Sequence, residues 1–428
     1  MYDFANSAFA ASVLVVIWPV YFAKSAVPAD GVRILGHAFS GDSLWALTVS
    51  ASMIAIGLVS PILGAICDVS ASKRRFLMVF WLLGFTATAA MGVVAPGMWA
   101  VGCALFIVAN VGFEGSSAIY NAFITELVPP DRVGRLSVFG WALGYAGSFF
   151  CLALNLGMIS LLPSLGWTDT TGAVRWGMVA VGLWWLIFAL PFFRGVAERA
   201  QPRPLPPGTN LIGYGFRKVG STLANIRRLK QLALFTVAYL IFSDGVNTVF
   251  VMATNFGQSE IKMTQGELIV CFLLIQVVGA AGAIAFGAVA ERVRQRPALL
   301  ICLVVWVAVL GWAFVMTRKW EFWALGVLVG LVMGGTQAIA RSMLALFTPP
   351  SCSAEFFGFF SIVGKFAAAI GPILFATIRE STGNVRYGIL SIAVMFVAGF
   401  ILLVPVNEAR GRQEAEEEER RLQGKAAA

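Results

Sequence analysis

Residues 3–9 read DFANSAF and residues 244–250 read DGVNTVF, so the pattern D-x-x-N-[S/T]-x-F occurs twice in the chain. Three further matches follow in sequence order: Gly64 and Asp68 with Gly287 and Glu291, Ala118-Ile119 with Ala338-Ile339, and Pro129-Pro130 with Pro349-Pro350. The separation between counterparts is nearly constant, apart from a shift that predicts a longer external loop at about 24–42. The chain therefore consists of two halves that repeat one arrangement of elements.

The composition is typical of a chain embedded in lipid. Of 428 residues, 59% are hydrophobic and only 12% are charged, whereas a soluble domain carries about 25% charged residues. Mean hydropathy is +0.82 over the full length. These values predict a polytopic membrane protein and exclude a soluble enzyme, a secreted disulfide scaffold and a disordered chain. The basic residues lie between apolar runs instead of on one face, so the pI near 9.5 does not indicate a nucleic-acid partner.

Twelve apolar runs are long enough to cross a membrane. A helix needs about 20 residues to cross the ~30 Å hydrocarbon core, and helices are expected because backbone amides in lipid need partners within their own segment. We predict an all-α membrane protein with twelve transmembrane helices in two six-helix pseudo-repeats. The spans are expected at 4–23, 43–66, 76–95, 98–122, 137–162, 174–193, 232–255, 267–290, 298–316, 321–346, 356–378 and 387–406.

Lysine and arginine indicate the orientation of these spans. With the N-terminus inside, the inner loops carry sixteen of these residues and the outer loops carry eight, and such an excess marks the cytoplasmic side. Both termini are therefore expected in the cytoplasm, and the absence of an apparent targeting segment favours a bacterial inner membrane. The predicted domains are an N-terminal bundle at 1–194, a cytoplasmic linker with an amphipathic helix at 195–231, a C-terminal bundle at 232–406 and a charged cytoplasmic tail at 407–428.

Six spans repeated in parallel are the plan of a major facilitator transporter. Residues 64–75, GAICDVSASKRR, resemble the signature of that superfamily between spans two and three, and depart from it at positions 69, 71 and 72. The chain also resembles the vacuole-effluxer-like (autophagy-type permease) family of the superfamily. The segments that carry this resemblance are YDFANSAF at 2–9, PPDRVGR at 129–135, GWALGY at 140–145, GGTQAIARS at 334–342, SAEFFG at 353–358 and GKF at 364–366.

The resemblance covers the membrane region from residue 2 to about residue 407. It implies a twelve-helix transporter whose characterised eukaryotic relatives are associated with amino-acid efflux from the vacuole. It also implies that the first helices of the four three-helix units line the central pathway. Asp244 lies about twelve residues inside its span, but only two residues precede Asp3. We therefore expect the first helix to lack part of its cytoplasmic start.

Polar side chains gather on the spans that should line this pathway. A charge at the centre of a membrane helix costs roughly 2.5–3.5 kcal/mol on insertion scales, so such residues usually face a cavity and have a function. The alternative is that they satisfy one another in a dry bundle, which we prefer for Asn110, Asn155 and Gln276. The expected substrate-binding residues are Asp3, Asn6, Ser7, Glu114, Ser117, Tyr120, Asn121, Asp244, Asn247, Gln337, Arg341 and Lys365.

Buried charges of both signs predict a zwitterionic solute. Arg341 or Lys365 would hold a substrate carboxylate, and a guanidinium suits this task because it offers two parallel donors. Glu114, Asp3 or Asp244 would then meet an amine. Arg341 lies near the end of its span, so an inner-gate ion pair is an equal alternative for it.

A coupling proton, if transport uses one, would have to be carried by a carboxylate. The only histidine, His37, falls in the first external loop, so no histidine relay crosses the bilayer. Glu114 and Asp244 are the candidates, because a buried carboxyl group holds a proton more readily than an exposed one.

The connection between spans two and three is expected to act in gating. An acid at a helix end with bases beyond it can form ion pairs that hold one access state and break in the other. Anchoring by the positive-inside rule explains the bases but not Asp68 with Gly64. The expected gating residues are Gly64, Asp68, Lys73, Arg74, Arg75 and Glu291.

No catalytic, cofactor or metal site is predicted. The six cysteines lack CxxC or metal-ligand spacing, and no phosphate-binding GxxxxGK[ST] occurs. We expect a monomeric secondary active transporter, not an enzyme, that moves a small polar or amino-acid-like solute by alternating access. Two alternatives stay open. One is a broad exporter of amphipathic compounds with aromatic side chains in its pocket, and the other is a non-transporting membrane receptor.

Overall fold

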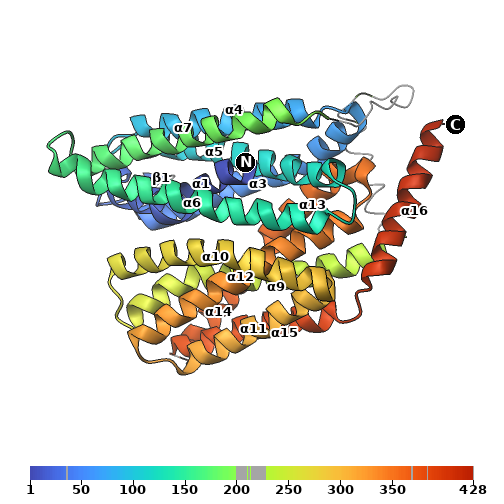
Figure 1. The fold of residues 1–428 in the computed structure, drawn as a ribbon. Coiled ribbons are helices and arrows are strands. Elements are labelled where there is room, and N and C mark those ends of the chain that lie inside the picture. Colours follow the sequence, from blue (N-terminus) through green and yellow to red (C-terminus); the bar gives the residue numbers. More distant parts are fainter. Residues whose placement is uncertain are drawn as a thin grey trace. The chain divides into compact units, whose positions relative to one another are not determined.

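The structure is a computed structural model that describes residues 1–34, 37–198, 210, 213, 228–367, 370–382 and 384–427. Most of these residues are helical (Figure 1). The helices of the first half after the first span are α3 (Gly41–Ser70), α4 (Lys73–Ala90), the short 3-10 helix η3 (Met91–Val93), α5 (Trp99–Leu127), α6 (Val133–Ser164) and α7 (Thr170–Gly195). Those of the second half are α9 (Lys230–Ser259), α10 (Gln265–Val293), α11 (Gln295–Val315), α12 (Lys319–Phe347), η5 (Pro350–Cys352), α13 (Ser353–Ala367), α14 (Ile370–Thr382), α15 (Val385–Leu403) and α16 (Glu408–Ala427).

Eleven of the described helical segments are long and apolar enough to cross a membrane. They correspond in order to the predicted spans one to ten and to span twelve. The eleventh predicted span, 356–378, coincides with α13 and α14, which are separated by residues 368 and 369 outside the described part. Of the predicted linker 195–231, only 195–198, 210, 213 and 228–231 are described, so its expected amphipathic helix lies outside the described residues.

The first span departs from a regular α-helix. It runs from α1 (Tyr2–Phe9) through the π-helix η1 (Ala10–Val16) and α2 (Trp18–Tyr21) to a second π-helix, η2 (Phe22–Ala26). The Ile17 amide binds the carbonyl of Ser12, five residues back, at 3.0 Å. Pro19 has no amide to donate, which loosens the regular pattern. Segments of π-helix within a longer helix occur frequently at functional sites.

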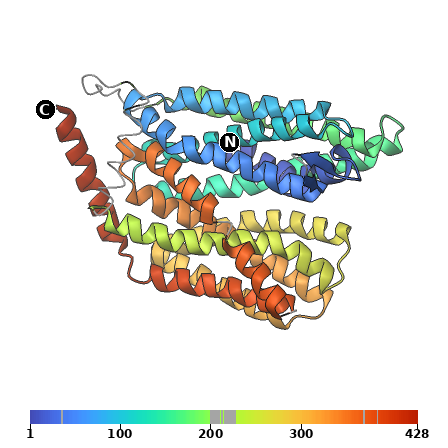
Figure 2. The ribbon, with the colours of Figure 1, turned by 180° about the vertical axis from the view of Figure 1, so that it is seen from behind.

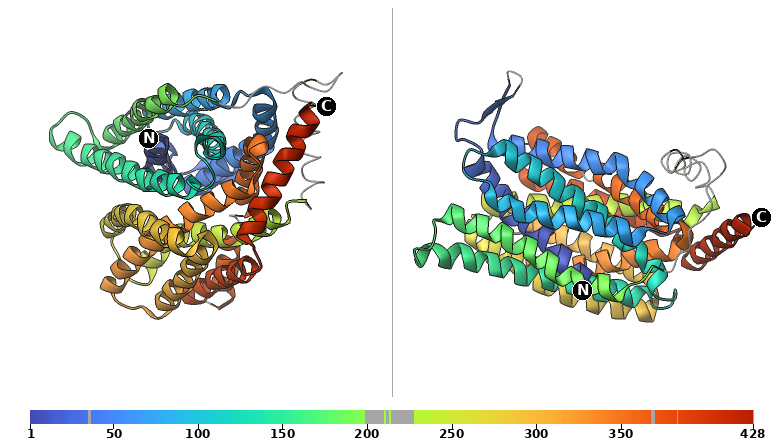
Figure 3. Two further views of the ribbon diagram at one scale, coloured as in Figure 1. Left: turned by 45° about the vertical axis from the view of Figure 1, so that its right-hand side comes forward. Right: turned by 90° about the horizontal axis from the view of Figure 1, so that it is seen from above.

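A short β-hairpin, which the sequence did not predict, follows the first span. Strands β1 (Val32–Ile34) and β2 (His37–Phe39) pair antiparallel, with Val32 opposite Phe39. The hairpin extends from the ends of the blue helices in the right-hand view of Figure 3. Gly31 has a positive φ of 76° at its start, a conformation that glycine adopts without strain.

The described chain forms two compact units, which do not coincide with the halves of the sequence. The first unit contains Met1–Ser60, Ser72–Tyr120 and Leu143–Glu198. The second contains Pro61–Ala71, Asn121–Ala142 and Arg199–Ala428. One end of each of α3, α5 and α6 therefore belongs to the second unit.

Buried aromatic side chains form the core of the first unit. Trp18, Trp185 and Phe9 are fully buried. A Cβ atom on Gly84 of α4 would lie 2.3 Å from the Trp185 ring, so this glycine makes room for the indole of α7. The ring of Phe9 stacks on that of Phe113, with 4.9 Å between the centroids. Large aromatic areas removed from solvent in this way hold α1, α4, α5 and α7 together.

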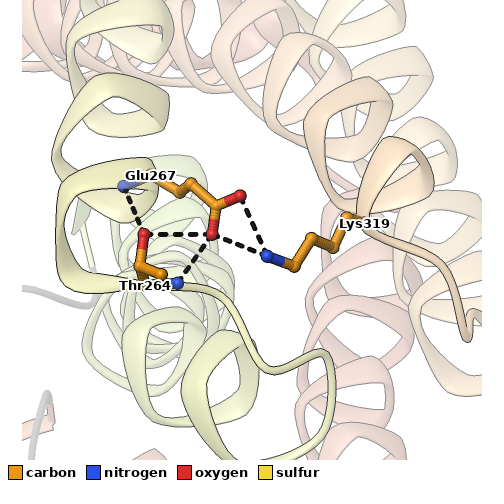
Figure 4. A network of polar contacts seen from close by, with 3 residues as sticks. All are labelled: Thr264, Glu267 and Lys319. Carbon is orange, nitrogen blue, oxygen red and sulfur yellow. Dashed lines mark hydrogen bonds and ion pairs between the residues drawn. The ribbon is translucent and has the colours of Figure 1, made fainter.

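In the second unit, glycines bring α10 and α12 into backbone contact. A Cβ on Gly282 would lie 2.2 Å from the Leu331 carbonyl oxygen, and one on Gly334 would lie 2.1 Å from that of Gly279. Small residues allow membrane helices to approach closely, and the gain is van der Waals contact that lipid cannot supply. The same two helices are joined at one end by side chains (Figure 4). Lys319 Nζ binds both carboxylate oxygens of Glu267, at 3.0 and 2.9 Å, and Glu267 and Thr264 form the capping box of α10.

Candidate functional site

Four predicted residues meet between α1 and α5 in the first unit. The Tyr120 hydroxyl donates to Asp3 Oδ2 at 2.6 Å, and Asn6 Nδ2 donates to Ser117 Oγ at 3.2 Å. Asp3 and Asn6 are only 8% and 6% exposed. Residues three apart on a helix share one face, so a single face of α1 carries both side chains. We name these four residues the α1–α5 cluster.

Two glycines of α6 position α1 next to this cluster. A Cβ on Gly147 would lie 2.1 Å from the Phe4 carbonyl oxygen, and one on Gly144 would lie 2.7 Å from Ser7 Oγ. The Ser148 hydroxyl donates to the Ser7 carbonyl at 2.9 Å. Larger residues at either glycine would push α1 away from α6. Ser7, a predicted binding residue, is therefore half-buried against α6.

Glu114 lies on α5 one turn before Ser117 and is 5% exposed. The neighbouring Phe113 contacts the aromatic core through Phe9. Glu114 thus lies inside the first unit. An ionised carboxylate at this depth is stable only with a polar or charged partner, because desolvation costs several kcal/mol.

Asp244 is bonded to the start of α14 in the second unit. Its Oδ2 accepts a hydrogen bond from the Gly371 amide at 2.8 Å, and the side chain is 2% exposed. Thr248 Oγ1 donates to the Asp244 carbonyl at 2.8 Å. A Cβ on Gly371 would lie 2.0 Å from Thr248 Oγ1, so only glycine allows this contact. Asp244 therefore binds a backbone amide, whereas its counterpart Asp3 accepts from a phenol.

Arg341 joins α12 to the ends of α5 and α6 that belong to the second unit. Its Nε donates to Ser137 Oγ at 3.0 Å, Nη2 donates to the Ser137 carbonyl at 2.7 Å, and Nη1 donates to Asn121 Oδ1 at 3.3 Å. The guanidinium carbon lies 5.4 Å from the Trp141 ring centroid, within the range of a cation–π contact. Arg341 is 8% exposed, and groups of two neighbouring helices accept its hydrogen bonds.

Two predicted residues, Asn247 and Gln337, form no part of the contacts described above. Asn247 is exposed, and Gln337 is half-buried one turn before Arg341. The helix α13 includes Lys365, but the position of its side chain lies outside the described part of the structure.

Gly64 and Asp68 of α3 contact the start of α13. Asp68 Oδ1 and Oδ2 accept hydrogen bonds from the amides of Ala354 and Glu355, at 3.2 and 2.9 Å. A Cβ on Gly64 would lie 2.3 Å from the Ala354 carbonyl oxygen. The first amides of a helix lack intrahelical acceptors, and a carboxylate there also interacts favourably with the helix dipole. The two residues thus form one contact, in which Gly64 permits the approach and Asp68 supplies the bonds.

The second copy of the motif, Gly287 and Glu291 on α10, contacts α6. A Cβ on Gly287 would lie 2.5 Å from Val138 Cγ2. Glu291 Oε1 forms an ion pair with Arg135 Nε at 3.5 Å, and both side chains are mostly exposed. In the repeat, α6 is the counterpart of α13, so the two copies of the motif contact equivalent helices.

The backbone amides of the basic residues after α3 bind an acid of the same unit. The amides of Lys73 and Arg74 donate to the two carboxylate oxygens of Glu198, at 2.8 and 3.1 Å. Lys73 is 1% exposed, and Arg75 is exposed. Glu198 therefore caps α4 within the first unit.

Sequence reasoning missed Glu198, Ser137 and Gly371. Each contacts a backbone group or side chain distant in sequence, and no local motif contains those pairs. A usable signal existed only for Gly371, because the Gly-Pro dipeptide at 371–372, which is typical of a turn or loop, lies within the predicted eleventh span. Among the described residues, no group of three or more His, Cys, Asp or Glu side chains could hold a metal ion.

Comparison with known proteins shows the same architecture. The model of the family described as vacuole effluxer Atg22 like matches residues 1–416. The chain is 30% identical to the MFS-type transporter YxiO of Bacillus subtilis (strain 168), over 95% of this chain and 94% of that protein. It is 24% identical to autophagy-related protein 22-1 of Penicillium rubens, over 93% and 81%.

A solved structure shows the fold. The human organic anion transporter MFSD10 matches with a TM-score of 0.69 at 15% identity, over 94% of this chain and 98% of that one. Such low identity shows the fold alone, which in major facilitator transporters consists of twelve helices in two halves. The matches together cover nearly the whole chain and agree with the duplicated motifs. This polytopic membrane protein therefore belongs to the vacuole effluxer Atg22-like family of major facilitator transporters.

Proposed function

We propose that the protein is a secondary active transporter that moves a small, amino-acid-like zwitterion by alternating access. The observation that carries the proposal is the α1–α5 cluster, where an acid, an amide and two hydroxyl groups are brought together on two apolar helices. Groups of this kind can bind an ammonium group and its neighbouring polar atoms. Burying them costs free energy, which favours a binding role over a purely structural one.

The charged residues that were predicted to meet the substrate have different proposed roles. Glu114, buried one turn from Ser117, is the proposed proton carrier, and it would alternate between proton and substrate amine. Arg341 is bonded to Ser137 and Asn121, which supports the gating alternative for this residue. Lys365 is then the candidate for the substrate carboxylate.

The orientation follows from the charges of the loops. We place both termini in the cytoplasm of a bacterial cell and the protein in its inner membrane, as a monomer. The contacts of Asp68 with α13 and of Arg341 with α5 and α6 would then lie near the cytoplasmic ends of their helices. Breaking them would open the pathway on that side.

The experiment that tests the proposal is flux into proteoliposomes that contain the purified protein. Radiolabelled neutral, acidic and basic amino acids are offered, first in exchange and then with an imposed pH gradient. Glu114→Gln should abolish accumulation driven by the gradient, and Asp3→Asn should weaken exchange about tenfold, since a charge-assisted contact is lost. Asp131→Asn, at a mostly exposed surface acid, is the matched control. Exchange and accumulation unchanged in both variants would contradict the proposal.

One observation favours the alternative of an exporter for amphipathic compounds. The second unit contains a cavity of about 130 Å³ between α9, α10, α11, α12, α14 and α15, lined by apolar side chains such as Phe250, Phe272 and Phe322. A cavity of this kind suits an apolar group. In the same vesicles, flux of a lipophilic cation without flux of any amino acid would support this alternative.

A further inference from the structure

The C-terminal helix α16 presents carboxylates to the starts of other helices of the second unit. Glu408 Oε2 accepts hydrogen bonds from the amides of Gln295 and Arg296, at 3.1 and 3.4 Å, where α11 begins. Glu414 Oε2 accepts from the Gln231 amide at 2.9 Å, where α9 begins. Figure 2 shows α16, in red, beside the first turns of the yellow-green α9.

The third carboxylate contacts the segment that leads into α13. Glu419 Oε2 accepts from the Ser351 amide at 2.9 Å and from the Ser351 hydroxyl at 2.6 Å. Ser351 lies in η5 (Pro350–Cys352), and α13 follows directly. Amides at a helix start have no intrahelical acceptor and lie at the positive end of the dipole. Three glutamates of one helix thus satisfy three separate helix starts.

Small residues of α16 also pack closely against the ends of neighbouring helices. A Cβ on Gly411 would lie 2.6 Å from the Phe347 ring at the end of α12. Ala415 is 4% exposed, and the Asn407 amide donates to Gln231 Oε1 at 2.7 Å. The sequence alone predicted only a charged tail here, because the few small residues that make the contact lie among many charged ones.

Two carboxylates from different parts of the chain meet on the η5–α13 segment. Asp68 of α3 binds the amides of Ala354 and Glu355, and Glu419 of α16 binds Ser351. The start of α13 is therefore held from two sides at once. Anything that loosens the hold of α16 should also alter the geometry that Asp68 requires.

We propose that α16 is a latch, and that Glu419 is a positioning residue that holds the start of α13 where Asp68 can bind it. The latch stabilises the state in which Asp68 binds the start of α13, so α16 regulates how often that contact breaks. This inference rests on the proposed function in one respect, namely that the Asp68 contact breaks during transport. Glu419 acts through Ser351 and does not contact the substrate.

Two native thiols report on this contact without any substrate. Cys352 adjoins Ser351 and is 3% exposed, and Cys67 adjoins Asp68 and is 0% exposed. The full-length protein is reconstituted, alkylated with N-ethylmaleimide, and digested so that mass spectrometry measures each thiol. Glu419→Gln should raise the alkylation rates of both Cys352 and Cys67 about tenfold, because a charged acceptor of two hydrogen bonds is lost. Cys302, fully buried in α11, is the internal reference.

Glu416→Gln is the matched control, because Glu416 lies on the same helix, is mostly exposed and pairs only with Arg420 at 3.9 Å among its described ion pairs. It should leave both rates unchanged. A rise at Cys352 alone would mean that η5 frays without affecting Asp68, and no rise at either thiol would mean that Glu419 does not hold the segment. Either result would overturn the latch.

A double variant separates the latch from two independent contacts. If Glu419 acts through the same segment as Asp68, then Asp68→Asn with Glu419→Gln should alkylate no faster than Asp68→Asn alone. If the effects of the two substitutions on the alkylation rates multiply, the proposal is overturned. Glu419→Ala serves as a second test if the glutamine variant expresses poorly. Because alkylation needs no transported solute, failure here is distinguishable from failure of the proposed transport activity.

Discussion

The Gly-x-x-x-acid motif at the end of α3 and its copy at the end of α10 have the same sequence pattern but different partners. Asp68 is buried and accepts from two backbone amides, whereas Glu291 is exposed and pairs with one exposed arginine. Gly64 faces a backbone carbonyl oxygen, and Gly287 faces the side chain of Val138. A backbone atom cannot change its rotamer, so the first copy tolerates substitution less than the second.

The largest effect is expected at Gly64. In Gly64→Ala the added methyl group would lie 2.3 Å from the Ala354 carbonyl oxygen, and relief requires movement of a helix. Overpacking of this kind costs ~3 kcal/mol, so transport in proteoliposomes should fall about a hundredfold. Gly311→Ala is the control, because nothing lies within 4 Å of a Cβ there. Equal transport rates for Gly64→Ala and Gly311→Ala would show that transport does not depend on the close approach of α3 to Ala354.

The next effect is expected at Asp68. Asp68→Asn removes the charge that interacts with the start of α13 and leaves one acceptor oxygen for two amides. Hydrogen bonds to charged groups contribute about 1.5–3 kcal/mol, so we expect the initial transport rate to fall roughly tenfold at constant expression. A rate like that of the unmodified protein would assign Asp68 no part in gating.

A smaller effect, which a second substitution should reverse, is expected at Gly287. The methyl group of Gly287→Ala would contact Val138 Cγ2 at 2.5 Å, and this side chain can shift or be shortened. We expect a loss of about 1 kcal/mol in thermal stability, with a modest loss of transport. Adding Val138→Ala should restore both, because it removes the clashing atoms. Failure of the second substitution to restore them would mean that the backbone, and not Val138, limits the space.

The smallest effect is expected at Glu291. Ion pairs between exposed side chains contribute about 0–1 kcal/mol and are weakened by salt. Glu291→Gln should therefore change the transport rate by less than about threefold, and the remaining difference should vanish at high ionic strength. A loss as large as that of Asp68→Asn would show that the two copies of the motif act symmetrically after all.

Local sequence predicted the spans well because hydropathy is additive along a helix. The runs around Glu114 and Asp244 were long enough to predict membrane helices. The pairing of Asp3 with Tyr120 was only partly accessible, since both were predicted binding residues but their contact was not predicted. The hydrogen bond between Gly371 and Asp244 and the hairpin after the first span were not predicted.

Length, hydropathy and the repeated motifs alone were enough to establish a duplicated helical membrane protein, because each of these properties follows directly from the order of residues along the chain. Which residues would contact one another could not be predicted in this way. Whether Asp68 would bind backbone amides, Asp244 would bind the Gly371 amide and Glu419 would reach Ser351 depended on which segments pack together. Close approach at glycines, and acceptors from other segments for the amides at helix starts, exist only once helices meet, so only the tertiary structure decided those contacts.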